Sequence, residues 1–310
     1  MTNVAFIGGP NSGKSVAAAL LNRAYTYAKS GTINDHIWPT PENYDPRARE
    51  LGFDMFDWRM VMGEKTMMFL RDKLIPNLES GAWPPASPDD RIDRLQFVFQ
   101  RPGGLIKGHN LKDKLIQPVE INLGVYEVAG EKFISILSII SRASKPGEIT
   151  EALKNEEVLD LMLRSDSFIM LINSEVCIPY PEGFRGKRSL RTESDFDLAI
   201  LLEALRNYKH HMGGTIKTFA FMFAKHDKVM YKLNLEKPKE YEDAIKKFLP
   251  TMYVDYQILK SKYNIGDAFY VKSGIKTVDD EEQKQKMPDC PLRFYIRDYL
   301  NLLEFLAKGR

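Results

Sequence analysis

Eight residues near the N-terminus, residues 8–15, carry glycine, lysine and serine at the spacing G-x-x-x-x-G-K-S. An apolar run at residues 4–7 predicts a buried strand before them, and an alanine- and leucine-rich stretch after them predicts a helix. In such a strand-to-helix turn, successive backbone N–H groups and the helix N-terminus point at phosphate oxygens. This stretch therefore predicts a nucleoside triphosphate site. The alternative is a glycine-rich turn followed by a chance Lys-Ser.

The residues of this loop have different expected roles. Gly8 and Gly13 let the backbone bend and come close to an anion. The Lys14 ammonium would reach the outer phosphates, and the Ser15 hydroxyl would ligate Mg²⁺. The predicted nucleotide-binding residues of the loop are Gly8, Pro10, Asn11, Ser12, Gly13, Lys14, Ser15 and Val16.

The composition is ordinary for a globular protein, with 310 residues, 44% of them hydrophobic and 28% charged. A net charge of +2 implies no general affinity for nucleic acid or membrane, and no apolar run is long enough to span a bilayer. Cys177 and Cys290 have no metal-site spacing and suggest no disulfide framework, so we expect a reducing, cytoplasmic environment. Because a strand begins at the N-terminus, we expect no cleaved signal peptide.

The first helix should begin at Lys14, run to about residue 28 and end at Ser30-Gly31, because glycine just past a helix favours termination. Beyond it, the patterns predict a loop at 32–46, a helical stretch at 46–78 broken near Gly63, and a proline-rich extended loop at 79–90.

The helical stretch is rich in methionine and aromatic residues. At helical spacing, we interpret them as an amphipathic pair of helices packed on the core. The alternative is an adaptable groove for a partner. The residues concerned are Phe53, Met55, Phe56, Trp58, Met60, Met62, Met67, Met68 and Phe69.

The rest of the chain alternates strands with helices. The predicted strands are 95–101, 119–128, 168–173, 217–223 and 267–271, the first two forming an antiparallel pair around a polar loop at 103–114. The predicted helices are 150–163 with Thr150 as cap, a helix capped by Ser194 or Asp195 that ends near His211, 239–263 interrupted at Pro250, and 292–306. Residues 179–191 would form an arginine-rich loop and residues 279–289 a charged connector.

This order predicts an α/β fold with a mostly parallel sheet, one antiparallel strand, helices on both faces and a helical insertion after the first helix. We expect residues 1–275 to form one domain, with the insertion at about 45–80, and residues 276–310 to be a connector and helix packed on that domain. The motifs all follow strands. Because ligands bind at the carboxyl ends of parallel strands, these motifs can converge on one site.

Taken in order, the motifs resemble those of the translation-factor-like and Ras-like P-loop GTPases. Residues 8–15 resemble the Walker A loop G-x-P-N-x-G-K-S of that class. Residues 127–131 (E-V-A-G-E) stand where the class has D-x-x-G, and residues 224–227 (A-K-H-D) where it has [NT]-K-x-D. Residues 272–274 (K-S-G) match its loop over the base. The Trp-Pro-Pro of residues 83–85 resembles prokaryotic "double-GTPase" domains. The resemblance covers about residues 1–275 and implies a Ras-like P-loop NTPase fold.

On the phosphate side, the resemblance implies a Mg²⁺ set of Ser15, Ser87 and Glu127. It implies that Gly130 gives its N–H to the γ-phosphate and that Glu131 orients the attacking water, so the implied catalytic residues are Lys14, Gly130 and Glu131. Glu127 replaces the usual Asp and Glu131 is charged where a neutral Gln is common, which together predict slow intrinsic hydrolysis. Alternatively, Glu127 is an ordinary strand-end carboxylate and Ser87 only caps a turn.

On the base side, the resemblance implies that Asp227 accepts two hydrogen bonds from the guanine edge and that the stem of Lys225 covers the base. Ser273 and Gly274 would line the other side. Ala224 stands where the class has Asn or Thr, so a side chain that braces these loops is lost. The alternative for residues 224–227 is a plain turn with a helix-capping aspartate.

Together these features predict a GTP-binding protein that hydrolyses GTP to GDP and phosphate with Mg²⁺ as a molecular switch. We expect a protein partner that contacts the switch segments, no direct nucleic-acid contact and no membrane span; a homodimer is possible. Two alternatives stay open: a P-loop ATPase using Glu127 as its acid, and a non-hydrolysing nucleotide-binding interaction module. The arginine-rich loop could supply an arginine to a neighbouring molecule's phosphates, or be a solvated basic loop.

Overall fold

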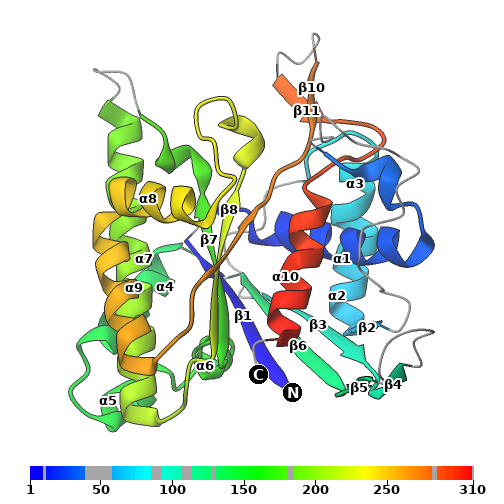
Figure 1. The fold of residues 1–310 in the computed structure, drawn as a ribbon. Coiled ribbons are helices and arrows are strands. Elements are labelled where there is room, and N and C mark those ends of the chain that lie inside the picture. Colours follow the sequence, from blue (N-terminus) through cyan, green and yellow to red (C-terminus); the bar gives the residue numbers. More distant parts are fainter. Residues whose placement is uncertain are drawn as a thin grey trace.

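A mixed β-sheet runs through the centre of the molecule, with helices packed on both of its faces (Figure 1). The computed structural model describes residues 1–9, 12–38, 58–84, 93–106, 114–127, 130–179, 185–280 and 285–308. Within these residues, the sheet has seven strands in the order β2-β3-β6-β1-β7-β8-β9. Their bounds are β1 Thr2–Gly8, β2 Arg59–Met62, β3 Asp93–Arg101, β6 Val119–Glu127, β7 Ser167–Asn173, β8 Thr218–Ala224 and β9 Phe269–Lys272.

Among the strands of this described sheet, only β3 is antiparallel to the others. It pairs antiparallel with β6 and with β2, whereas β6, β1, β7, β8 and β9 pair parallel in succession. The predicted antiparallel pair is therefore confirmed, and so is the predicted α/β fold class. The arrangement is consistent with a Ras-like P-loop fold that carries β2 as an added edge strand.

The apolar runs predicted as strands form the centre of the sheet. Every residue of β8 is buried, and β1 is buried from Val4 onward, because helices cover both faces. Successive side chains of a strand point to opposite faces. Phe6 therefore belongs to the core under α1, and Ile7 to the core under α7.

The helices divide between the two faces (Figure 1). One face carries α1 (Lys14–Ser30), α2 (Glu64–Phe69), a π-helical turn η2 (Leu70–Leu74), α3 (Ile75–Glu79) and α10 (Ile296–Lys308). The other carries α4 (Gly130–Arg142), α5 (Pro146–Ala152), α6 (Glu157–Arg164), α7 (Arg185–Met212), α8 (Pro238–Phe248) and α9 (Pro250–Tyr263). Short 3-10 turns are η1 (Ile33–His36), η3 (Ser174–Cys177) and η4 (His226–Lys228).

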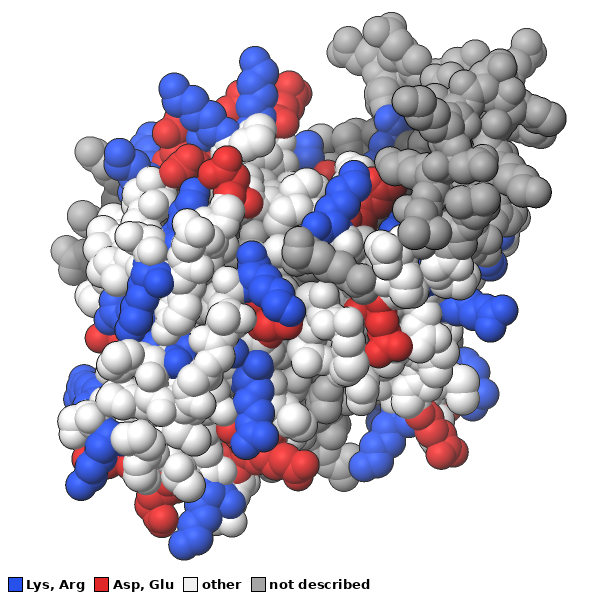
Figure 2. Space-filling view, turned by 60° about the horizontal axis from the view of Figure 1, so that its bottom comes forward, with Lys and Arg blue, Asp and Glu red and all other residues white. Residues whose placement is uncertain are grey.

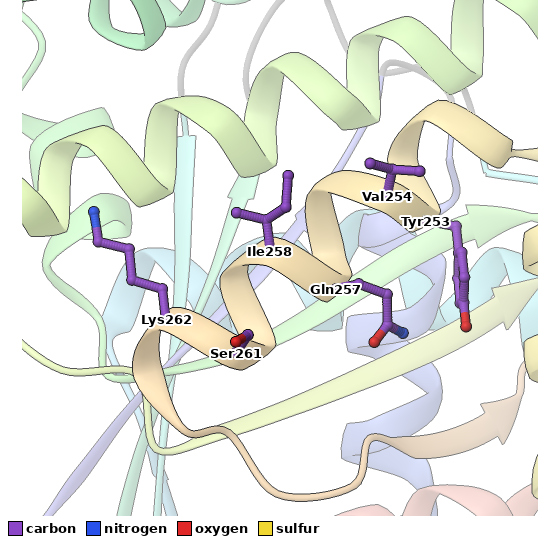
Figure 3. Close-up of a pocket in the computed structure, with 6 residues that line it drawn as sticks. All are labelled: Tyr253, Val254, Gln257, Ile258, Ser261 and Lys262. Atoms are coloured by element: carbon purple, nitrogen blue, oxygen red, sulfur yellow. The ribbon is translucent and has the colours of Figure 1, made fainter.

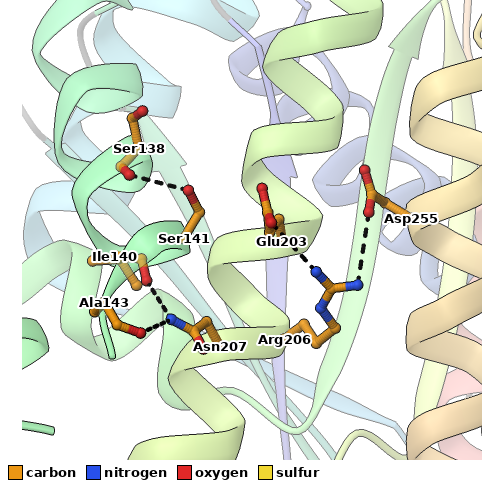
Figure 4. A network of polar contacts seen from close by, with 8 residues as sticks. All are labelled: Ser138, Ile140, Ser141, Ala143, Glu203, Arg206, Asn207 and Asp255. Carbon is orange, nitrogen blue, oxygen red and sulfur yellow. Dashed lines mark hydrogen bonds and ion pairs between the residues drawn. The ribbon is translucent and has the colours of Figure 1, made fainter. Parts of the chain in front are cut away.

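Polar contacts fasten α7 to its neighbours on both sides (Figure 4). Asn207 donates from its side-chain amide to the carbonyl oxygens of Ile140 (2.8 Å) and Ala143 (2.7 Å), which satisfies the C-terminal end of α4. Arg206 pairs with Glu203 of its own helix at 3.4 Å and with Asp255 of α9 at 3.8 Å. These contacts hold the three helices as one layer over the sheet.

The predicted end of the first helix is confirmed. Gly31 adopts φ 77° and its N–H bonds to the carbonyl of Tyr27. This left-handed conformation is one that glycine adopts without strain. The predicted interruption at Pro250 is confirmed as well, since α8 ends at Phe248 and α9 begins at Pro250.

The helical prediction for residues 46–78 is wrong at residues 59–62, which form the edge strand β2. Met60 and Met62 lie opposite Phe99 and Phe97 of β3, and their sulfurs accept hydrogen bonds from the Asn22 amide. Pairing with a neighbouring strand has overridden the local helical spacing. The helix begins at Glu64 instead, and residues 46–57 lie outside the described residues. From there to Glu79 the buried residues Leu70, Leu74, Ile75 and Leu78 pack on the core, whereas Met67 and Met68 are exposed.

The prediction that Ser194 or Asp195 begins a helix is also wrong. α7 starts at Arg185, so the predicted loop at 179–191 ends earlier than expected. Asp195 is buried within α7, and its carboxylate accepts from the backbone N–H groups of Thr251 (3.1 Å) and Met252 (2.8 Å). This aspartate therefore caps a helix, but the helix is α9 rather than its own.

Four further segments differ from the prediction. Thr150 lies inside α5 and not at a cap, and the helix predicted over 150–163 is two short helices separated by a turn. α4 has a strongly amphipathic pattern that the sequence analysis did not use. The two connectors at 103–114 and 279–289 overlap two hairpins. These are β4 (Gly104–Ile106) with β5 (Lys114–Ile116), and β10 (Thr277–Asp280) with β11 (Gln285–Pro288).

The surface carries both signs of charge. On the face in Figure 2, lysine and arginine side chains are interspersed with aspartate and glutamate. In the part of the chain that the structure describes, no helix combines the length and apolar character needed to cross a membrane.

Asp195→Ala is expected to lower the free energy of unfolding by about 1–2 kcal/mol, because two N–H groups of α9 lose their acceptor. Asp195→Asn keeps one acceptor oxygen and should lose less. Urea unfolding measures both. Asp267→Ala is the control: it removes an exposed carboxylate paired with Lys260 and should change the value by less than about 1 kcal/mol. An Asp195→Ala variant as stable as the wild type would contradict the capping role.

Candidate functional site

The turn between β1 and α1 is built around two glycines. β1 ends at Gly8, which pairs with Leu171 of β7. Gly13 precedes the first residue of α1 with φ 90° and ψ 22°, a left-handed conformation, and its carbonyl accepts from the N–H of Ala17 at 2.9 Å. Because Gly13 has no side chain, it provides no capping oxygen for the N–H groups of the first turn. An anion at this helix end can accept them instead.

Gly8 has almost no free space around it. A Cβ at this position would lie 2.8 Å from the Ser12 hydroxyl and 3.1 Å from both Cβ and the backbone oxygen of Leu171. The next residue, Gly9, would meet nothing within 4 Å. Close packing between the loop and β7 therefore requires glycine at position 8. At position 9 there is room for a larger side chain.

The Lys14 side chain folds back over the loop from the first turn of α1. Its ammonium donates to the carbonyl oxygens of Gly9 (2.8 Å) and Gly8 (3.1 Å) and lies 3.4 Å from the Ser12 hydroxyl. Lys14 is 8% exposed, so its positive charge is held inside the loop close to these carbonyl oxygens. Phosphate oxygens are stronger acceptors for an ammonium than these carbonyls.

The structure describes the remaining loop residues only in part. Ser15 and Val16 lie half-buried in the first turn of α1. Pro10 and Asn11 lie outside the described residues.

The turn after β8 lies directly beside this loop. A Cβ on Gly13 would lie 3.7 Å from the Cβ of Ala224, the last residue of β8. Lys225 follows in a left-handed conformation with φ 57°, and η4 carries Asp227. The structure thus brings the predicted phosphate loop and the predicted base loop into contact, although more than two hundred residues separate them in the sequence.

Asp227 is partly buried in this turn. Burial raises the pKa of its carboxyl to about 6, although backbone N–H groups, including that of Ile275, and the charge of Lys228 act in the opposite direction. Burial likewise lowers the pKa of Lys225. A partly buried carboxylate is a strong acceptor for a ligand that can donate hydrogen bonds.

The loop after β9 closes against Asp227. A Cβ on Gly274 would lie 2.5 Å from the Asp227 Oδ1, so glycine permits this approach. Backbone hydrogen bonds join the two loops: the His226 N–H donates to the carbonyl of Ser273, and the Ser273 N–H donates to that of Phe223. The Ser273 side chain is buried and points toward α10, where its hydroxyl lies 2.5 Å from that of Tyr299.

The third predicted motif is described only in its backbone. β6 ends at Glu127, opposite Asp93 of β3, and α4 begins at Gly130 and includes Glu131. β1 pairs Phe6 with Val125, so continuing this register by two residues places Glu127 level with Gly8. Val128, Ala129 and the predicted metal ligand Ser87 lie outside the described residues.

Two tyrosines that the sequence analysis did not consider hold the base loops. Tyr295 bonds to the ring of His226, and Tyr299 bonds to Ser273. They lie 69 and 26 residues from their partners, so no local pattern indicates the contacts.

Arg191, from the predicted arginine-rich loop, has an internal role. Its guanidinium donates to the carbonyl oxygens of Val176 and Ile178 and lies over the ring of Phe248.

A hollow of about 540 Å³ lies away from these loops, along α9 (Figure 3). Its lining residues are Tyr253, Val254, Gln257, Ile258, Ser261 and Lys262. They come from one helix and include none of the predicted site residues. The candidate site is therefore the group of loops at the carboxyl ends of the parallel strands.

No protein-family model matches the chain, and neither does any curated protein. Among solved structures, the chain is similar to one from the signal recognition particle receptor SRb-GTP/SRX complex of Chaetomium thermophilum. The two chains share 9% sequence identity over 88% of this chain and 90% of the other, with a TM-score of 0.37.

Gly8→Ala is expected to lower the free energy of unfolding by about 1–3 kcal/mol, because the added methyl group overlaps Ser12 and the backbone of β7. The adjacent Gly9→Ala is the matched control, since its methyl group would meet nothing within 4 Å. Thermal or urea unfolding of both variants measures the difference. Equal stability of the two variants would show that the loop does not pack against β7 as described.

Proposed function

We propose that this protein binds guanine nucleotides with Mg²⁺, hydrolyses GTP slowly to GDP and phosphate, and acts as a nucleotide-dependent molecular switch. One observation carries the proposal: the glycine-rich loop packs against the end of β8, with Gly13 next to Ala224. The predicted phosphate loop and a half-buried carboxylate, that of Asp227, therefore border the same edge of the sheet.

At the phosphate end, the N–H groups of the first turn of α1 and the Lys14 ammonium would take the β- and γ-phosphates. The ammonium already lies inside the loop, bonded to the carbonyl oxygens of Gly8 and Gly9. Binding would exchange these neutral acceptors for charged ones, which strengthens the hydrogen bonds. This arrangement supports positioning and charge stabilisation as the main sources of catalysis.

Side-chain oxygens at the proposed phosphate end suit Mg²⁺, because this ion prefers oxygen ligands. The Ser15 hydroxyl lies in the first turn of α1, and the strand register sets Glu127 level with Gly8. Ser15, Ser87 and Glu127 are the proposed ligand set. When bound, the ion would neutralise charge on the phosphate oxygens.

For hydrolysis, the N–H of Gly130 would contact the γ-phosphate and Glu131 would orient the water. α4 begins at Gly130, so its N-terminus adds a favourable dipole at the phosphates. The Glu131 carboxylate can accept a proton from the water but repels the phosphate, which supports slow turnover.

At the base end, Asp227 would accept two hydrogen bonds from guanine, a pairing that adenine cannot offer. The stem of Lys225 would cover one face of the base, and the backbone at Ser273 and Gly274 would line the loop beside it. The left-handed turn at Lys225 and the close approach of Gly274 to Asp227 support this arrangement.

A protein partner would detect the nucleotide through the switch segments, the first of which we place between residues 30 and 90.

Wild-type protein with Mg²⁺ is expected to bind GDP at least a hundredfold more tightly than ADP, a difference of about 2.7 kcal/mol. Asp227→Ala should remove this preference by weakening GDP binding and leaving ADP binding unchanged. A competition titration with fluorescent GDP measures both constants, and phosphate release from GTP is followed in parallel. Asp267→Ala serves as the control, since its carboxylate lies at the surface beside Lys260. If ADP competes equally in the wild type, the guanine assignment is wrong and a P-loop ATPase remains.

GDP affinity is expected to be constant above pH 6 and to fall about tenfold per pH unit below it. The reason is that guanine binds the ionised carboxylate of Asp227, and burial raises the pKa of this carboxyl in the free protein to about 6. Protonation below that value therefore competes with the ligand. The dissociation constant is measured from pH 5 to 8.

Two controls isolate the Asp227 carboxyl in this pH series. ADP has the same titrating phosphates, and Asp227→Ala keeps Asp298, whose pKa burial also raises to about 6. A fall in GDP affinity that is identical in Asp227→Ala would contradict the assignment.

A further inference from the structure

The first turn of α10 and the residue just before it contact both predicted base loops. The hydroxyl of Tyr295 is 2.8 Å from Nδ1 of His226, and that of Tyr299 is 2.5 Å from the Ser273 hydroxyl. All four residues are at most 4% exposed. Hydrogen bonds between buried polar groups hold the two segments in one relative position, because moving apart would leave both groups without a partner.

The direction of the first hydrogen bond follows from the surroundings of His226. Its Nε2 lies 3.2 Å from the carbonyl oxygen of Leu233, which can only accept, so Nε2 carries a proton. Burial lowers the pKa of this imidazole to about 4, which leaves the ring neutral near pH 7. Nδ1 must then accept, and the Tyr295 hydroxyl donates to it.

Each tyrosine partner is the immediate neighbour of a predicted base-binding residue. His226 precedes Asp227, and Ser273 precedes Gly274. The two loops are also joined by the hydrogen bond from the His226 N–H to the Ser273 carbonyl. A shift of either loop would change the position of the Asp227 carboxylate relative to the base.

The same stretch is fastened to the chain that follows α1. The N–H of Phe294 donates to the carbonyl of His36 at 3.1 Å, and the N–H of Trp38 donates to the carbonyl of Phe294 at 3.0 Å. The rings of Trp38 and Tyr295 meet edge to face, 5.0 Å apart. Phe294 also bridges to Ile275, just past Gly274. The tyrosines therefore project from a backbone fixed on two sides.

We propose that Tyr295 and Tyr299 are positioning residues that hold the two base loops in the arrangement that selects guanine. They act through His226 and Ser273 and do not contact the nucleotide. This inference rests on the proposed function and adds to it the structural basis of base selectivity: the first turn of α10 and the residue just before it carry the groups that set it.

The test measures the dissociation constants of GDP and ADP for Tyr295→Phe and Tyr299→Phe. Each change removes one hydroxyl and keeps the ring. The ratio of the ADP constant to the GDP constant should fall about tenfold for each variant, the factor that corresponds to about 1.4 kcal/mol. The ADP constant itself should stay unchanged, and so should the rate of phosphate release at saturating GTP.

Two further variants separate positioning from general destabilisation. Tyr256→Phe is the matched control, because Tyr256 is a buried tyrosine of α9 whose hydroxyl has no hydrogen-bond partner among the described residues. It should leave the ratio unchanged. Ser273→Ala combined with Tyr299→Phe should lower the ratio no further than either change alone, because both remove the same hydrogen bond.

The outcomes distinguish this inference from the proposed function. A wild type without guanine preference overturns both. A wild type that prefers guanine, with Tyr295→Phe and Tyr299→Phe retaining that preference, overturns the positioning role alone. Equal weakening of GDP and ADP binding also overturns it, because the tyrosines would then support the whole site rather than the base loops.

Discussion

The parallel register of β1, β7 and β8 is the constraint on which the candidate site depends. It sets Gly8 against Leu171 and Asn173 against Ala224, so the turns that leave these strands have to meet at one edge. The meeting is close enough that a methyl group on Gly8 would overlap β7. Since the strands are buried on both faces, slipping the register by one residue would exchange the two cores and is strongly disfavoured. The geometry of the loops thus follows from packing deep in the sheet.

Bringing these loops together buries polar groups, and the structure provides each with a compensating contact. The Lys14 ammonium has two backbone carbonyls, and the neutral His226 ring has Tyr295 and Leu233. Asp227 is compensated in part: burial raises the pKa of its carboxyl, whereas nearby backbone N–H groups and the charge of Lys228 lower it. An incompletely satisfied acceptor at the rim of a site is stabilised further by a ligand that donates to it. A ligand that donates hydrogen bonds to Asp227, as the proposed guanine would, completes this compensation.

The sequence predicted the centre of the fold better than its edges. β7 and β8 are apolar throughout and bounded by turns, so burial on both faces is visible in the composition. Residues 59–62 were predicted as helix because methionines suit either structure, and only pairing with Phe97 and Phe99 decides for a strand. Asp195 has the chemistry of a helix cap, but the capped helix begins 55 residues later, at Pro250. The residue type indicated its role, while the partner was determined by packing.

The same distinction applies to the site. The proposed phosphate loop can be recognised in eight consecutive residues because its glycines, its lysine and the following helix N-terminus are neighbours in the sequence. The proposed base loops lie at the ends of separate strands. The groups that hold them are Tyr295, just before the last helix, and Tyr299 in its first turn. Such contacts form only after the chain between them has folded, so the proposed base site depends on the assembled sheet together with α10. A substitution in α10 can therefore alter the base loops while leaving the sequence of every recognisable motif intact.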